Sequence, residues 1–91
     1  MAGLSVEQAA RLFQALSDGT RLRLLQHLAA HGEVCVHELV ACAGVSQPAV
    51  SHHLMLLRGN RLVESRRQGQ RIAYRITSPL LRKLLRLTCG P

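Results

Sequence analysis

The sequence predicts a mainly α-helical domain with a small β-hairpin, an α+β fold in the order α-α-α-α-β-β-α. Two patterns support this prediction. Apolar side chains recur at helical spacing before Gly59 and again after Pro79, whereas they alternate with polar side chains over residues 71–76. Because 91 residues bury one small core, we expect a single domain over residues 1–91.

Capping residues mark the first two predicted helices. Ser5 with Gln8 forms a capping-box pattern at the start of a helix over about residues 5–16. Asp18 is a typical N-cap for a second helix that runs to about His31, where Gly32 stops it. The apolar side chains of the first helix share one side: Val6, Ala9, Ala10, Phe13 and Leu16. Those expected to point inward from the second are Leu22, Leu25, Leu28 and Ala29.

Two further helices separated by a glycine-containing turn predict a helix-turn-helix over about residues 36–60. After a very short strand at residues 34–35, a third helix starts at Val36 and ends at Gly44, a residue type favoured after helix ends. Ser46 caps the fourth helix, and Pro48 lies in its first turn, where a missing N–H is tolerated. The side chains expected inside are Val50, Leu54 and Leu57. A tight Gly-containing connection is typical of this motif.

A hairpin and a leucine-rich helix complete the chain. Residues 62–77 are predicted to form two strands around the turn Gln68-Gly69-Gln70. A last helix begins at Ser78-Pro79, and its apolar face is wider than one small core needs: Leu80, Leu81, Leu84, Leu85 and Leu87. This surplus apolar surface predicts a homodimer, because a second subunit would cover it.

The charge distribution favours a nucleic-acid partner. The formal net charge is +7, and nine of the twelve Lys and Arg residues follow Gly44, with Glu64 the one acid among them. A membrane-surface protein or a merely basic domain would also be basic, but no apolar run approaches the ~20 residues of a membrane span. No leader peptide is recognisable, and three unevenly spaced cysteines do not suggest a disulfide framework. We therefore expect a cytoplasmic location and no membrane partner.

The fourth helix offers side chains that could read bases. Opposite its apolar face lie Gln47, Ser51, His52 and Met55. Gln can bond adenine with two hydrogen bonds, and Ser and His can bond bases or phosphates. Ser46 and the N–H groups at the helix start suit a phosphate. His53 is expected nearer the inward side. The alternative interpretation is an ordinary solvated helix face.

The hairpin tip concentrates positive charge. Its candidate DNA-contacting residues are Arg66, Arg67, Gln68, Gln70 and Arg71. Such a hairpin can lie over phosphates or enter the minor groove as a wing. The alternative is an edge hairpin that its charges keep from aggregating. The absence of an acid from the tip favours the wing.

Three segments together resemble the ArsR/SmtB family of metalloregulatory repressors: 16–25 (LSDGTRLRLL), 44–54 (GVSQPAVSHHL) and 67–74 (RQGQRIAY). The resemblance covers about residues 5–88. It implies a winged helix-turn-helix with its wing at about residues 62–77, and a homodimer joined through helices 5–16 and 79–89. It also implies a repressor of a pseudo-palindromic operator in double-stranded DNA, released by a metal ion or another inducer. Gly19 departs from the family, which usually has Pro there.

The resemblance also points to an inducer site. The family's Cys-containing box corresponds here to residues 33–39 (EVCVHEL), with Cys35 at the first thiolate and His37 in place of the second. Such a pair can bind nickel, zinc, cobalt or copper. Cys42 lies two helical turns further on, so a full ligand set needs Cys89, His31 or the other subunit. The family's site in the last helix is absent, because that helix lacks acids and histidines.

Several alternatives remain open at this stage. Cys35 could be a simple buried thiol, a redox sensor with Cys89, or part of a protein that senses nothing or an unrecognised ligand. The basic surface could bind an acidic protein instead of DNA. An enzyme is not expected, since the sequence has no Gly-rich phosphate loop, paired carboxylates or Ser/His/Asp set.

Overall fold

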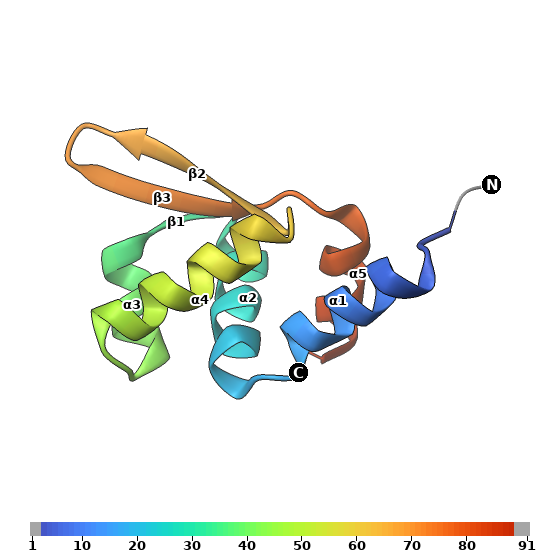
Figure 1. Cartoon of the computed structure of the whole chain (residues 1–91). Coiled ribbons are helices and arrows are strands. Elements are labelled where there is room, and N and C mark those ends of the chain that lie inside the picture. Colours follow the sequence, from blue (N-terminus) through green and yellow to red (C-terminus); the bar gives the residue numbers. More distant parts are fainter. Residues whose placement is uncertain (1–2, 89–91) are drawn as a thin grey trace.

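The computed structural model describes residues 3–88, and the predicted order of elements is confirmed with one addition. The elements are α1 Val6–Leu16, α2 Gly19–His31, β1 Glu33–Cys35, α3 Val36–Ala43, α4 Gln47–Gly59, β2 Val63–Gln68, β3 Arg71–Ile76 and α5 Pro79–Thr88. Helices α3 and α4 and the β2–β3 hairpin lie toward one end of the molecule, and α1 and α5 lie toward the other (Figure 1). The arrangement is a winged helix-turn-helix.

The helix ends form where the capping residues predict them. Ser5 and Gln8 make the full capping box, with N···O distances of 3.1 and 2.9 Å. The Asp18 carboxylate accepts the N–H of Arg21 at 2.9 Å, and the Ser46 hydroxyl accepts the N–H of Ala49 at 3.3 Å. Gly44 adopts φ 70°, the left-handed conformation that ends α3. Local hydrogen bonding therefore fixes where these helices begin and end.

Helix α2 forms the centre of the aliphatic core. Its Leu24, Leu25 and Leu28 are completely buried, and α1, α3 and α5 all pack against it. The sequence predicted that the apolar side chains of α1 share one side, but they lie on two sides of the helix. Leu12 and Ala15 enter the core, whereas Val6 is 82% and Phe13 61% exposed. Helix α1 thus presents a second, uncovered apolar stripe to solvent.

A third strand, which the predicted order of elements omits, completes the sheet. The strand order is β1-β3-β2, and both pairings are antiparallel. Strand β1 is only three residues long, and its central Val34 is buried opposite Tyr74. The short strand at residues 34–35 is therefore confirmed, but its pairing with β3 joins segments far apart in the chain. Sequence periodicity carries no signal for such a pairing.

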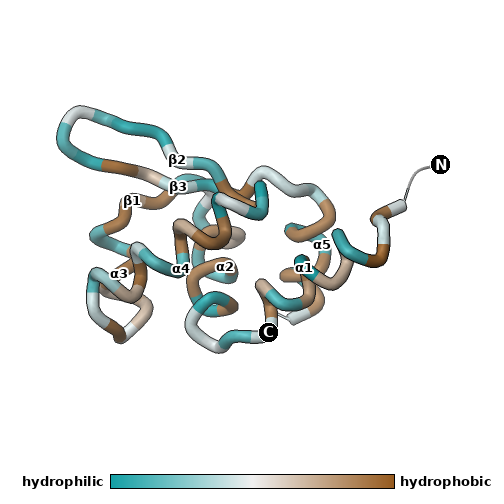
Figure 2. Tube along the Cα trace, in the orientation of Figure 1, coloured by the Kyte–Doolittle hydropathy of each residue, from teal (hydrophilic) through white to brown (hydrophobic). Residues whose placement is uncertain are grey.

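The C-terminal helix also leaves apolar side chains uncovered. Leu81 and Leu85 are buried, whereas Leu80 is 42% and Leu87 83% exposed. Figure 2 shows hydrophobic residues on α1 and α5 at one end and a largely hydrophilic hairpin at the other. Within residues 3–88, no helix combines the length and apolarity that crossing a membrane requires.

Candidate DNA interface

Helix α4 presents a polar stripe because its apolar residues are used inside. Val50, Leu54 and Leu57 are at most 1% exposed, which fixes the rotation of the helix about its axis. The opposite face carries the sequence-predicted residues Gln47, Ser51, His52 and Met55, all of them exposed. Gln47, Ser51 and Met55 follow one another at intervals of four, so they lie in a row along the helix. Their side chains are available to a groove.

An arginine that the sequence analysis did not single out holds α4 in place. Arg21 donates to the carbonyl oxygens of Gln14 and Ala15, at 3.1 and 3.2 Å, at the end of α1. Its Nη1 also lies 3.4 Å from Nδ1 of His53 on α4. His53 is part-buried, as expected, and its Nε2 lies 3.9 Å from the Asp18 carboxylate. The N–H of Arg21 is the main cause of the lowered pKa of Asp18. This small polar cluster ties the exposed stripe to two other helices.

The two faces of the hairpin carry different chemistry. Side chains alternate along β2, so Ser65 and Arg67 share one face and Arg66 and Gln68 share the other. The Ser65 hydroxyl accepts from Arg58 of α4 at 3.3 Å. Arg67 is therefore on the hairpin face that turns toward α4. Arg58 is a further cation at this junction that the candidate residues did not include.

The opposite face of the hairpin is tied to β1. Arg66 forms an ion pair with Glu33 at 2.8 Å, and the Gln68 amide donates to the same carboxylate at 3.3 Å. Arg71 lies opposite Gln68, so it belongs to this face as well. Arg66, Arg67 and Arg71 thus do not form one patch. All five predicted tip residues are exposed: Arg66, Arg67, Gln68, Gln70 and Arg71.

The turn of the hairpin depends on glycine. Gly69 has φ 63°, in the left-handed region that a side chain disfavours. The Arg67 side chain donates to the Gly69 carbonyl oxygen at 3.1 Å, which bends this guanidinium toward the tip. The sequence predicted the turn correctly from Gln68-Gly69-Gln70. The wing is consequently a tight two-stranded ribbon with charge at its end.

A family comparison decides the class of this domain. Residues 18–65 match the model of the family described as "Bacterial regulatory protein, arsR family". This chain belongs to that family. The matched segment runs from the N-cap of α2 to the middle of β2, so it contains the helix-turn-helix whose polar stripe is described above.

Individual relatives agree with the family assignment. The arsR-family chain is 44% identical over 80 residues to "Transcriptional repressor SmtB homolog" of Synechocystis, covering 88% of the chain and 60% of the relative. It is 45% identical over 69 residues to "Arsenic resistance transcriptional regulator ArsR2" of Pseudomonas putida, covering 76% of the chain and 60% of the relative. The chain therefore spans about 60% of the length of these curated relatives.

A solved structure agrees with the fold. The homodimeric winged helix-turn-helix DNA-binding domain of Mb0332 from Mycobacterium bovis superposes with a TM-score of 0.80. The identity is 36%, and the match covers 97% of this chain and 86% of the other. This likeness extends over the whole winged helix-turn-helix, including the hairpin and the terminal helices.

The cysteines of this arsR-family chain do not form a complete metal centre within residues 3–88. Cys35 is half-buried on β1, and His37 is exposed in the first turn of α3. No group of three or more potential ligands comes together in that range. Burial raises the pKa of the Cys42 thiol, with the Glu38 carboxylate adding to the effect, and its sulfur donates to the Leu39 carbonyl oxygen. Cys89 lies outside the described residues. Cys35 and His37 would therefore need further ligands from outside the described residues to complete a metal site.

Proposed function

We propose that this protein is a sequence-specific DNA-binding transcriptional regulator, a repressor that binds a pseudo-palindromic operator as a homodimer. The observation that carries the proposal is that the α4 stripe and the Arg67 face of the wing adjoin one another. The Arg58–Ser65 hydrogen bond joins the two elements at this side. A helix in the major groove beside a cationic ribbon is how winged helix-turn-helix domains engage a duplex.

The two elements have separate roles in this proposal. Gln47, Ser51 and His52 contact base edges, while Met55 makes apolar contacts in the groove. Ser46 and the N–H groups at the start of α4 bind a backbone phosphate. The wing residues contact phosphates or the minor groove: Arg66, Arg67, Gln68, Gln70 and Arg71. Among them Arg67 contributes most, because Arg66 is already paired with Glu33.

The homodimer is proposed to form through α1 and α5. Val6 and Phe13 of α1 and Leu80 and Leu87 of α5 leave apolar surface uncovered. Burying such surface stabilises a subunit interface by about 25 cal/mol per Å² before association costs. The Mycobacterium bovis domain with the same fold is homodimeric, which supports this arrangement.

Selection of duplexes from random DNA tests the function. We expect a pseudo-palindromic consensus, bound about 10³-fold or more tightly than random duplex at fixed salt. The S51A/H52A variant should lose this preference but keep its weak binding to random DNA, because its phosphate contacts remain. A protein that binds every duplex alike, or none, would contradict the proposal.

We further propose that a metal ion regulates the binding of DNA. A relative's name refers to arsenic resistance, and Cys35 with His37 could supply two ligands for nickel, zinc, cobalt or copper. The remaining ligands would come from the partner subunit or from Cys89. Each metal should be titrated into reduced protein bound to operator. We expect the metal to release the operator from the native protein and from the C42S variant, but not from C35S. If all three proteins respond alike, the proposal that Cys35 binds the metal is wrong.

A further inference from the structure

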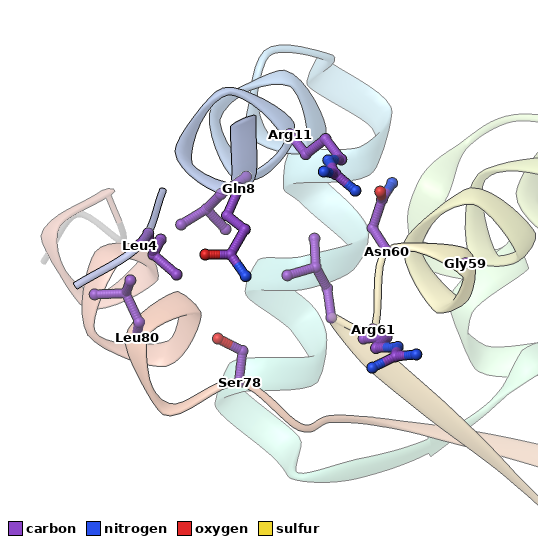
Figure 3. Close-up of a pocket in the computed structure, with 10 residues that line it drawn as sticks. Leu4, Gln8, Arg11, Gly59, Asn60, Arg61, Ser78 and Leu80 are labelled. Carbon is purple, nitrogen blue, oxygen red and sulfur yellow. The ribbon is translucent and has the colours of Figure 1, made fainter. Parts of the chain in front are cut away.

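A cavity of about 510 Å³ lies between α1, the connection from α4 to β2 and the start of α5 (Figure 3). Its volume falls within the range of about 300–1,000 Å³ found for small-molecule sites. Neither the residues of the α4 stripe nor Cys35 and Cys42 line it. Its lining includes Gln8, Arg11, Leu12, Arg61, Leu62 and Leu80.

The cavity has one apolar end and one cationic end. In Figure 3, Leu4 and Leu80 lie at one side, and Arg11, Asn60 and Arg61 lie at the other. The wall between the two ends includes two buried leucines, Leu12 at 6% and Leu62 at 8% exposure. The amide of Gln8 points into the space between the two ends. A ligand that fits both ends has a charged head and an apolar tail.

The cationic end lacks counter-charge. No acidic side chain lines the cavity, and the ion pairs within residues 3–88 include neither Arg11 nor Arg61. The one polar contact of the Arg11 side chain in that range is a 3.4 Å bond to the Glu7 carbonyl oxygen. Two guanidinium groups beside a concave, partly apolar surface attract an anion.

The backbone at the cationic end is held in an unusual conformation. Arg61 has φ 59°, the one non-glycine residue of the described chain in the left-handed region. Its N–H donates to the Arg58 carbonyl oxygen, and its own carbonyl accepts from the Thr77 hydroxyl, both at 3.0 Å. Such a conformation is strained for a residue with a side chain, and strained residues are frequent at ligand sites.

The end of α4 does not oppose an anion there. The carbonyl oxygen of Leu56 accepts from the backbone and side-chain N–H groups of Asn60, and that of Leu57 accepts from Leu62. These bonds satisfy carbonyl groups that would otherwise give the helix end a partial negative charge. The helix that starts at the cavity, α5, adds the partial positive charge of an N-terminus.

We propose that this cavity binds a small organic carboxylate with an aliphatic tail. The carboxylate lies between Arg11 and Arg61, and the tail lies along Leu12 and Leu62 toward Leu80. Because the cavity touches the end of α4 and the start of the wing, its occupant also changes operator affinity. This second effect rests on the proposed DNA-binding function, whereas carboxylate binding does not.

The cavity stays accessible in the proposed dimer. Gln8 and Arg11 are three residues apart and share a face of α1, as do Val6 and Phe13, which are seven apart. At about 100° per residue, the two faces are about 180° from one another. The uncovered apolar stripe of α1 can therefore meet a partner while the cavity face remains open, with Leu80 at the border.

Calorimetry with octanoate, in the absence of DNA, tests the binding. Arg61→Asn removes the charge and retains a residue that tolerates the left-handed conformation, and Arg11→Gln removes the other charge. Each variant should bind octanoate about tenfold or more weakly. Arg86→Gln, on an exposed arginine of α5 outside the cavity, should bind as the native protein does. Acetate and 1-octanol, which carry only the head or only the tail, should bind much more weakly.

Nuclear magnetic resonance locates the site and shows whether each variant is folded. Octanoate should shift the amide signals of Gln8, Asn60 and Leu62 and leave those of α3 unchanged. Equal affinity of the native protein and both variants, or shifts outside the cavity, would overturn the proposal. Operator affinity is then measured with and without octanoate. If octanoate binds but does not change operator affinity, only the regulatory part of the proposal is wrong. If the protein does not bind an operator at all, the proposed function is wrong, whether or not octanoate binds.

Discussion

Helix α4 and the wing contribute to the same candidate surface but are held very differently. The stripe of α4 is backed by three side chains at most 1% exposed and by the contact between His53 and Arg21. The wing tip from Arg67 to Ile72 is exposed on every residue, and the side chains that tie this end of the wing to β1 are Gln68 and Arg66, which both bond the Glu33 carboxylate. Base recognition needs fixed hydrogen-bond geometry, whereas phosphate attraction needs only nearby charge. The firmly packed α4 therefore suits base recognition, and the exposed wing suits phosphate attraction.

Removing the backing of α4 should have the largest effect. Leu54→Ala should lower the free energy of unfolding by about 2–5 kcal/mol, because it leaves a cavity behind the stripe. The equivalent truncation in the wing, Ile72→Ala, removes a side chain that is 43% exposed and should cost less than about 1 kcal/mol. Urea denaturation at one protein concentration measures both. Similar losses for the two variants would show that the wing is as firmly packed as α4.

Truncating the stripe itself should alter specificity without altering stability. Ser51→Ala or His52→Ala should weaken binding to the selected operator by about 1–3 kcal/mol when the lost contact is to a base. Binding to random duplex should change little. Fluorescence anisotropy with both duplexes measures the two affinities. An equal loss on both would mean that the residue contacts phosphate and not a base.

Wing arginines should instead change the salt dependence. Arg67→Gln should reduce the slope of log affinity against log salt by about one unit per lost phosphate contact, on every duplex. Arg66→Gln is the matched control, since its guanidinium is paired with Glu33 on the opposite face. Its slope should change less. If Arg66 proves the more important of the two, the assignment of wing faces is wrong.

The smallest effect concerns the cluster behind α4. The pKa of Asp18 is lowered, chiefly by the Arg21 N–H, so its ionised form stabilises the folded state. That stabilisation is complete above the ordinary pKa of about 4 and is lost as the pH falls through the lower folded-state value. Asp18→Asn keeps an oxygen acceptor but does not titrate. Below about pH 4 the native protein should lose stability more steeply than D18N in acid titrations followed by circular dichroism.

Local signals made most of the fold predictable. Capping residues such as Ser5, Asp18 and Ser46 act on their own helix, so their effect is readable from a few neighbouring positions. The turn at Gly69 was likewise predictable, because it depends on the backbone conformation of one residue. The same holds for the rotation of α4, because its buried and polar residues alternate at clear helical spacing.

Contacts between distant segments were not predictable. The pairing of β1 with β3, the Glu33–Arg66 ion pair and the contact of His27 with Glu38 at 2.6 Å all join residues from separate elements. Helix α1 has two apolar sides, and periodicity alone did not show that Leu12, and not Phe13, faces the core. The cavity near Arg61 was missed because its walls come from three places in the chain.

The position of Arg21 links the end of α1 to the polar stripe of α4. One guanidinium holds the last carbonyl groups of α1 and lies against the imidazole of His53. If α1 shifts against a partner, this side chain must either follow it or give up two hydrogen bonds. In the proposed dimer on DNA, Arg21 therefore couples subunit assembly to the position of α4 inside each protomer, before any inducer takes part.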